Sequence, residues 1–122
     1  ELLFKWGLFD REPLSSWCRG RVGLLGDAAH PILPFLGHGA VLAIEDAIVL
    51  GRAFAESATV AEALSRYEAA RMARASKAVR DSRKAVKIFH SHEPEKYAQK
   101  TGGKAADERL GLFDYNPTNV PV

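Results

Sequence analysis

The chain has 122 residues, of which 47% are hydrophobic and 26% charged, and its formal net charge is +2. These values are typical of one soluble globular domain with a modest core, and the small net charge does not by itself indicate nucleic-acid binding. No run approaches the roughly 18 apolar residues of a membrane span, and the single cysteine, Cys18, fits a reducing cytoplasm.

Short segments precede the first predicted helix. Residues 2–9 are apolar with two interruptions, which predicts a strand. Residues 10–13 (Asp-Arg-Glu-Pro) predict a turn, and residues 14–18 predict one helical turn. The run over residues 22–25 is short and apolar throughout, which predicts a second strand that is buried on both faces.

Two long helices are predicted further along the chain. The loop over residues 27–38 contains two prolines and a glycine, which disfavour regular structure. From Ala40 the apolar residues recur at helical spacing and predict a helix to about Ala55. Thr59 and Glu62 form a capping-box pattern, which predicts a second helix over residues 60–90. Its apolar side would consist of Val60, Ala63, Leu64, Tyr67, Ala75, Ala78, Val79, Val86 and Phe89.

The C-terminal region carries weaker signals. Pro94 predicts the start of a short further helix, and Gly102 with Gly103 predicts its end. Residues 116–122 contain two prolines and no periodicity, so we expect an irregular tail. The predicted fold class is therefore a mostly helical α/β fragment with two short strands followed by long helices.

The junction between the second strand and the first long helix, over residues 21–40, is the most informative stretch. The strand ends at Gly26 and Asp27, and a helix N-terminus follows at about Gly39. A carboxylate can accept hydrogen bonds from ligand hydroxyls, and the N–H groups of a first helical turn can meet negative charge. The pattern favours a site for a polyhydroxylated, partly anionic ligand. An isolated Gly-Asp would more often only cap a turn, but the following Ala-Ala-His favours the site.

This Gly-Asp-Ala-Ala-His junction resembles the second flavin-binding fingerprint of the FAD-dependent aromatic-ring monooxygenases, and within them the salicylate hydroxylase-like group. The resemblance extends to Lys-Trp-Gly-Leu-Phe-Asp-Arg-Glu-Pro at residues 5–13, to residues 43–47 and 66–68, and to residues 112–115. It implies the C-terminal third of a Rossmann-like FAD-binding flavoprotein hydroxylase. Because the chain also opens on Glu1, we expect a fragment of a longer enzyme.

The resemblance divides the chain into three regions. Residues 1–13 would be the end of a substrate-domain strand and its turn. Residues 14–56 would be the FAD-binding strand, loop and helix. Residues 57–122 would be a C-terminal helical region and tail.

The resemblance also implies roles for individual residues. Gly26 and Asp27 are candidate cofactor-binding residues, and the Asp27 carboxylate would accept hydrogen bonds from the ribityl chain of FAD. Pro34 would face both flavin and substrate, although a rigid loop corner explains this proline equally well. The pyrimidine edge of the flavin would be met by the backbone N–H groups of Gly39, Ala40 and Val41.

Two histidines in the loop allow more than one interpretation. His30 could be a general base, but a structural role is favoured. His38 stands where glutamine is usual in the family. It could change flavin polarity or pH response, and a solvent-facing position is equally compatible. No residue of this chain is assigned as catalytic, because the resemblance places the catalytic base upstream.

The resemblance implies an enzyme that uses FAD, NAD(P)H and O2 to hydroxylate a small aromatic substrate related to salicylate or hydroxybenzoate, through a flavin C4a-hydroperoxide. We expect a cytoplasmic enzyme, compatible with a homodimer, and a fragment that is inactive by itself. The identity of the substrate and the choice between NADH and NADPH are not readable here.

Two alternatives stay open. The parent protein could be another FAD oxidoreductase of the same superfamily, such as a reductase or an epoxidase. The chain could instead be a helical binding module that uses a basic stripe, although a solvated helix face explains the stripe better and no nucleic-acid partner is expected. Cysteine and histidine spacings do not indicate a metal site. The stripe consists of Lys77, Arg80, Lys84 and Lys87.

Overall fold

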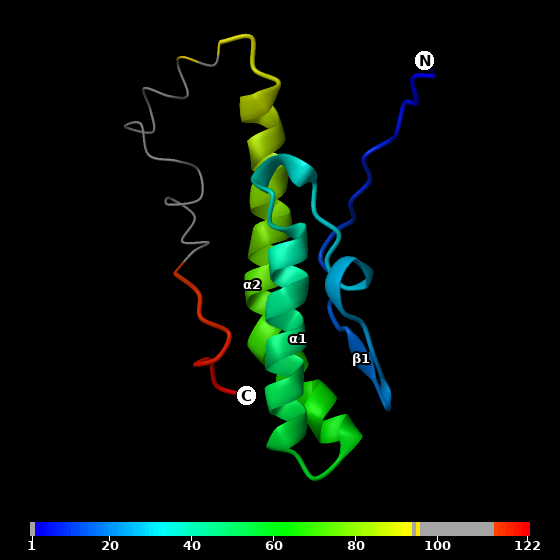
Figure 1. Cartoon of the computed structure of the whole chain (residues 1–122), viewed down its shortest axis with the longest axis vertical. Helices are drawn as coiled ribbons and strands as arrows, with labels where there is room; N and C mark the ends of the chain where they lie inside the picture. Colours follow the sequence, from blue (N-terminus) through cyan, green and yellow to red (C-terminus); the bar gives the residue numbers. More distant parts are fainter. Residues whose placement is uncertain (1, 94, 96–113) are drawn as a thin grey trace.

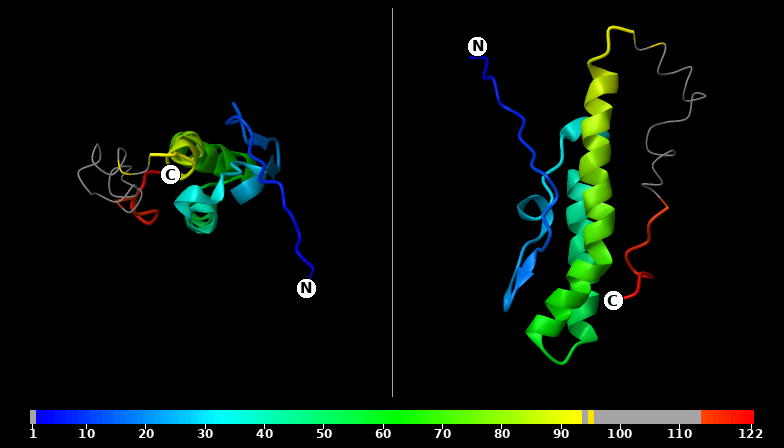
Figure 2. Two further views of the ribbon diagram at one scale, coloured as in Figure 1. Left: turned by 90° about the horizontal axis from the view of Figure 1, so that it is seen from above. Right: turned by 180° about the vertical axis from the view of Figure 1, so that it is seen from behind.

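The computed structural model describes residues 2–93, 95 and 114–122, and all structural statements below concern these residues. Two long helices lie side by side between the N-terminal segment on one flank and the C-terminal residues on the other (Figures 1 and 2). The elements in chain order are β1 (Cys18–Arg19), β2 (Val22–Gly23), the 3-10 helices η1 (Gly26–Ala28) and η2 (Pro34–Leu36), α1 (Gly39–Ala55) and α2 (Val60–Phe89).

Both long helices confirm the periodicity of the sequence. Leu42, Val49 and Ala53 of α1 are fully buried, because their spacing puts them on one face of the helix. The cap of α2 forms where the capping-box pattern predicts it. The N–H of Glu62 donates to the Thr59 hydroxyl at 3.2 Å, and the Glu62 carboxylate accepts from the N–H of Ala58 at 3.1 Å.

The apolar side predicted for α2 is largely confirmed. Its fully or nearly fully buried members are Ala63, Leu64, Tyr67, Ala75, Ala78 and Val79. Phe89, in contrast, is 63% exposed, because the last turns of α2 extend past α1 (Figure 2). There the ring of Phe89 lies against the ring of Phe35 in η2, with the ring centroids 5.6 Å apart.

Both predicted strands differ from the structure. The strand predicted over residues 2–9 is wrong, because this segment has no regular secondary structure and its large side chains are exposed. The strand predicted over residues 22–25 is reduced to β2, which pairs antiparallel with β1 and is exposed rather than buried. A strand needs neighbouring strands to pair its backbone polar groups, and the described part of the chain supplies only this two-residue partner.

The helical turn predicted over residues 14–18 is also wrong. Residue 15 lies in a bend, and the chain enters β1 at Cys18. Trp17 explains the difference, since its side chain is only 4% exposed. The indole packs against the rings of His30 and Tyr67, with centroid distances of 5.3 and 5.9 Å. These long-range contacts outweigh the local preference for a helical turn.

The C-terminal residues 116–122 are irregular, as predicted, and lie along the helix pair. Arg52 of α1 donates from Nη1 to the carbonyls of Pro117 at 2.9 Å and Val120 at 2.7 Å. The short helix predicted after Pro94 lies outside the described residues. Within the described part of the chain, neither helix has the combined length and apolarity needed to cross a membrane.

Candidate cofactor-binding site

Gly26 opens the turn that follows the hairpin, and two observations explain why glycine stands there. Its φ is +59°, a value that side chains disfavour, and a Cβ would lie 3.3 Å from the Cβ of Ala43. The Gly26 N–H donates to Oδ2 of Asp46 at 3.0 Å. The contribution of Gly26 is therefore to shape the turn, because its N–H group is already used within the protein.

The predicted site residue Asp27 projects from this turn. Its side chain is exposed and makes no hydrogen bond to any residue that the structure describes. An aspartate that only capped the turn would accept a hydrogen bond from a nearby backbone N–H. That alternative is not seen, and the carboxylate is available to accept hydrogen bonds from a ligand.

The N-terminus of α1 offers donors at the other end of the loop. The first N–H group that donates a helical hydrogen bond is that of Leu42, and its acceptor is the carbonyl of His38 at 2.9 Å. His38 makes no side-chain cap to the first turn, and that turn holds no acidic residue. The N–H groups without an acceptor earlier in the helix are therefore those of Gly39, Ala40 and Val41.

Pro34 and His38 lie between these two groups. The Pro34 carbonyl accepts the N–H of Gly37 at 3.0 Å, and Gly37 ends η2 with a φ of +65°. This geometry supports a rigid loop corner, whereas a position facing flavin and substrate stays a prediction. His38 is only 4% exposed, and its Nδ1 contacts the carbonyl of Leu36. The solvent-facing alternative for His38 is therefore wrong.

A buried carboxylate, Asp46 of α1, fixes the turn from inside. It is 0% exposed, and its Oδ2 atom contacts Nε2 of His30 at 2.6 Å as well as the Gly26 N–H. Its Oδ1 atom accepts from Nε of Arg71 in α2 at 2.7 Å. His30 itself is 3% exposed. Because it is buried and engaged, the geometry supports its structural role over that of a general base.

Asp46 is charged within this environment. Burial by itself raises the pKa of a carboxyl group, but hydrogen bonds from His30, Arg71 and Gly26 outweigh burial and lower the pKa of Asp46. For Arg71, burial acts to lower the pKa, but the interactions with Asp46 and Tyr115 together more than offset it. The ion pair between Asp46 and Arg71 is thus held in its charged form between the two helices.

A second ion-pair group lies beside the first. Glu45 accepts two hydrogen bonds from Arg74, at 2.7 and 2.6 Å, and one contact from Nη2 of Arg71 at 2.8 Å. The ring of Tyr115 lies over both guanidinium groups, with its centroid 5.0 Å from the Arg71 carbon and 4.0 Å from that of Arg74. The C-terminal residues are therefore coupled to the helix pair at this point.

The Arg-Tyr-Glu block of α2 holds the hairpin. The Glu68 carboxylate accepts the N–H groups of Trp17 and of Cys18, the latter at 2.7 Å. Burial would raise the pKa of Glu68, but these N–H groups lower it. The Tyr67 hydroxyl donates to the carbonyl of Leu24 at 3.1 Å. This block therefore sets where the hairpin sits on α2.

The Asp-Arg-Glu-Pro motif has a similar fastening role. Arg11 donates from Nη2 to the carbonyl of Ala29 at 2.9 Å and also to the carbonyl of Ala28. Asp10 and Glu12 both pair with Arg83 of α2. The motif thus ties the N-terminal segment to the η1 turn and to α2.

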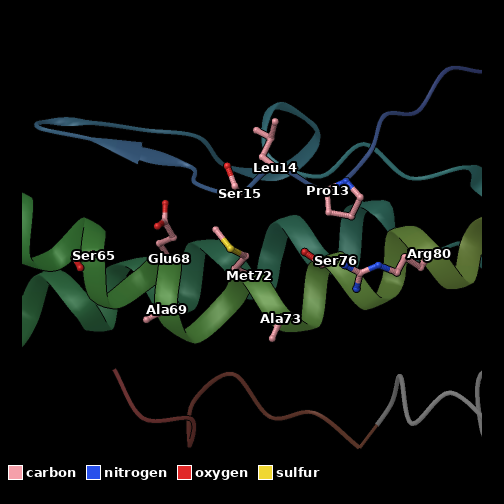
Figure 3. A pocket seen from close by; sticks show the side chains of 10 residues that line it. All are labelled: Pro13, Leu14, Ser15, Ser65, Glu68, Ala69, Met72, Ala73, Ser76 and Arg80. Atoms are coloured by element: carbon pink, nitrogen blue, oxygen red, sulfur yellow. The ribbon is translucent and has the colours of Figure 1, made fainter.

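A shallow groove of about 760 Å³ lies between residues 13–15 and α2 (Figure 3). Glu68 and Met72 of α2 line it opposite Leu14 and Ser15. None of the predicted site residues line the groove, so it is distinct from the candidate cofactor-binding site. Its full lining is Pro13, Leu14, Ser15, Ser65, Glu68, Ala69, Met72, Ala73, Ser76 and Arg80.

The basic stripe of α2 is partly neutralised. Asp81 accepts from Nζ of Lys77 at 2.8 Å and from Nζ of Lys84 at 2.7 Å. Burial acts to raise the pKa of Asp81, but these two lysines lower it. The stripe therefore fits a solvated helix face better than a binding surface.

Asp46 is the functional candidate that the sequence interpretation missed. A signal for it exists, because residue 46 falls on the same helix face as the buried residues Leu42, Val49 and Ala53. A carboxylate on a buried face needs partners from elsewhere in the fold. The sequence alone does not identify those partners.

Comparisons with known proteins identify the family to which the chain belongs. A family model described as an FAD binding domain matches residues 6–82. The 3-hydroxybenzoate 6-hydroxylase of Polaromonas naphthalenivorans is 39% identical over 94% of this chain and 30% of that protein. The 6-hydroxynicotinate 3-monooxygenase of Pseudomonas fluorescens is 42% identical over 97% of this chain and 27% of that protein.

Solved structures give the same result. Klebsiella pneumoniae HpxO complexed with FAD and uric acid matches with a TM-score of 0.71 and 38% identity, over 84% of this chain and 27% of that chain. A salicylate hydroxylase substrate complex matches with a TM-score of 0.77 and 30% identity, over 92% of this chain and 29% of that chain. The chain thus spans less than a third of the length of these proteins.

Proposed function

Because this chain belongs to the FAD binding domain family, we propose that it forms part of the flavin cradle of an FAD-dependent monooxygenase that hydroxylates a small aromatic substrate. The observation that carries the proposal is that one loop has a carboxylate acceptor at its start and uncapped N–H donors at its end. Asp27 has an exposed carboxylate without a partner in the described chain, and the first turn of α1 has uncapped N–H groups.

The chemistry of these groups fits FAD. The ribityl chain offers hydroxyl donors, and an ionised aspartate is an acceptor only. The N-terminus of α1 favours negative charge, which reduced flavin carries at its pyrimidine edge. We therefore assign Asp27 to the ribityl chain, and Gly26 to the shape of the turn. The pyrimidine edge is assigned to Gly39, Ala40 and Val41.

Bound FAD would supply the redox chemistry of hydroxylation, namely the uptake of electrons from NAD(P)H and the activation of O2. The residues of this chain would bind and orient the cofactor, and Pro34 would border the substrate. The named relatives act on hydroxybenzoate and hydroxynicotinate, and a structural neighbour holds uric acid. We therefore expect an aromatic or heteroaromatic ring that already carries an oxygen substituent.

The three regions expected from the sequence are part of the proposal. Residues 1–13 would belong to the end of the substrate domain, although they form no strand in this structure. Residues 14–56 would supply the FAD-binding segment with its loop and helix, and residues 57–122 would support them. The catalytic base is assigned to a part of the enzyme outside this chain. A cytoplasmic location is proposed on the basis of the single cysteine.

The test is Asp27→Ala in the full-length protein. Loss of the acceptor leaves ligand hydroxyls unpaired, which costs about 1–3 kcal/mol and weakens FAD affinity by about tenfold to a hundredfold. The free energy of unfolding of the FAD-free protein should not change, because Asp27 makes no hydrogen bond to the described chain. Glu56→Ala, which removes an exposed acid at the other end of α1, controls for net charge. Equal FAD affinity in wild type and Asp27→Ala would overturn the assignment.

A further inference from the structure

Asp46 joins three segments that are distant in the sequence. It lies on α1, its Oδ2 atom holds both Gly26 and His30, and its Oδ1 atom holds Arg71 of α2. The carboxylate is fully buried. Each of its oxygens therefore has protein partners, and none of its contacts is made to solvent.

The two residues that contact Oδ2 lie on either side of Asp27 in the sequence. Gly26 precedes Asp27 in the chain and His30 follows it, and both are held at 2.6–3.0 Å by one oxygen atom. The carbonyl of Gly26 also accepts the N–H of His30 at 2.8 Å, which closes the turn. Asp27 itself has no hydrogen bond to the described residues. The position of Asp27 is therefore set by the turn, and the turn is held by Asp46.

The neighbouring acid Glu45 provides a built-in comparison. Both residues lie buried on α1 and both pair with Arg71. Among the described residues, Glu45 pairs with Arg71 and Arg74 of α2, whereas Asp46 also reaches the turn. Loss of either carboxylate weakens the helix pair, because it leaves a buried guanidinium short of a partner. Only loss of Asp46 also releases Gly26 and His30.

We infer that Asp46 is a positioning residue for FAD: it fixes the turn over residues 26–30 so that the Asp27 carboxylate is presented to the cofactor. The inference rests on the proposed function, since it concerns the same site. It assigns a role in cofactor affinity to a side chain that has no exposed surface and cannot touch the cofactor directly.

The experiment compares Asp46→Asn with Glu45→Gln in the full-length protein. Asparagine removes the negative charge that strengthens the hydrogen bonds from Gly26 and His30. Its NH2 group also faces a donor in either orientation, the Arg71 Nε–H or the Gly26 N–H, so the turn loosens. We expect the dissociation constant for FAD to rise about tenfold or more in Asp46→Asn, and to stay within about twofold in Glu45→Gln.

A second measurement does not depend on FAD. Amide hydrogen exchange of the FAD-free protein reports opening of the turn directly. Exchange at the amides of residues 26–30 should be about tenfold faster in Asp46→Asn than in wild type, and unchanged in Glu45→Gln. If Asp46 only stabilised the helix pair, Asp46→Asn and Glu45→Gln should change FAD affinity and amide exchange to the same extent.

The outcomes separate this inference from the proposed function. A wild-type protein that binds no FAD overturns the proposed function and this inference with it. Wild-type binding together with unchanged affinity in Asp46→Asn, or an equal loss in Glu45→Gln, overturns this inference alone.

If Asp46→Asn does not fold, His30→Gln and His30→Ala replace it. The glutamine amide can still donate to Asp46, so it should keep FAD affinity where alanine loses it, and equal affinities in the two variants would contradict the inference.

Discussion

The helix pair and the N-terminal segment are both rich in apolar residues, yet only the helix pair buries them. Leu42 and Val49 of α1 are 0% exposed, whereas Leu3 and Phe9 are 96% and 86% exposed. A helix pairs its own backbone groups and needs one neighbour for its apolar face, but a strand needs partners on both edges. The contrast shows which part of the fold this chain completes by itself and which part requires contacts from outside the described residues.

The largest effect is expected from removing a buried charge between the two helices. Arg71→Met leaves Asp46 as a buried carboxylate without its guanidinium, which should lower the free energy of unfolding by about 3–5 kcal/mol. Chemical denaturation followed by circular dichroism would measure the loss. Arg74→Met is the control, because the Arg74 side chain is 14% exposed and Glu45 keeps its contact with Arg71. Equal losses in the two variants would mean that burial of the charge does not decide the effect.

The next test loosens the fastening between the two regions. Glu68→Gln weakens the acceptor for the N–H groups of Trp17 and Cys18, and should cost about 1–3 kcal/mol at pH 7. Because the pKa of Glu68 is lowered in the folded state, its stabilisation is complete above the ordinary glutamate pKa of about 4.3 and is lost as the pH falls through the folded value.

The free energy of unfolding, measured for wild type and Glu68→Gln from pH 7 to pH 3, checks this sign. The gap between the two proteins should narrow as the pH falls below about 4.3. A gap that stays constant over this range would show that the charge on Glu68 is not what holds the hairpin.

A finer test acts on the end of α1 that faces the loop. Ala40→Pro removes one first-turn N–H group and keeps a helix-compatible φ. The reduction potential of bound FAD should fall by about 30 mV, equivalent to about 1.4 kcal/mol, because the reduced anion loses more stabilisation than the neutral oxidised ring. Asp27→Ala should leave the potential near the wild-type value, since the ribityl chain does not change charge. Dye-linked titration of both variants separates the two roles, and an unchanged potential in Ala40→Pro would count against the helix terminus.

The smallest effect is expected at the exposed end of the chain. Phe4 is 74% exposed, so Phe4→Ser should change the free energy of unfolding of the 122-residue chain by less than about 0.5 kcal/mol. The same change should reduce concentration-dependent association, which sedimentation would detect, because it removes part of an exposed apolar segment. A large loss of stability would show that residues 2–9 pack against the helices in solution.

The same contrast explains what could be predicted from the sequence. The end of α1 at Ala55 and the start of α2 at Val60 depend on local signals such as the Thr59 cap, so the sequence predicts both correctly. The residues 22–25 could not be placed correctly, because their burial depends on neighbours that the sequence of this segment does not contain. The flavin-site residues were suggested by a resemblance, and the structure adds the turn and the helix terminus that surround them.

Asp46 shows the limit most directly. Its partners His30, Gly26 and Arg71 lie 16, 20 and 25 residues away in the sequence. The first two belong to the turn and the third belongs to α2. Periodicity identifies the face on which residue 46 lies, but it does not reveal which distant donors meet there. The arrangement needs the tertiary structure, because each donor is positioned by a different element.

The Tyr115 ring over Arg71 and Arg74 has a consequence for how the protein is handled. A ring against the guanidinium faces excludes water from them, which lowers the local dielectric constant and strengthens their attraction to Glu45. The chain's last nine residues, 114–122, thereby influence charge pairing between two helices to which they do not belong. A truncation that removes Tyr115 would therefore weaken charge pairing between the two helices, and the truncated protein would differ in stability from the 122-residue chain.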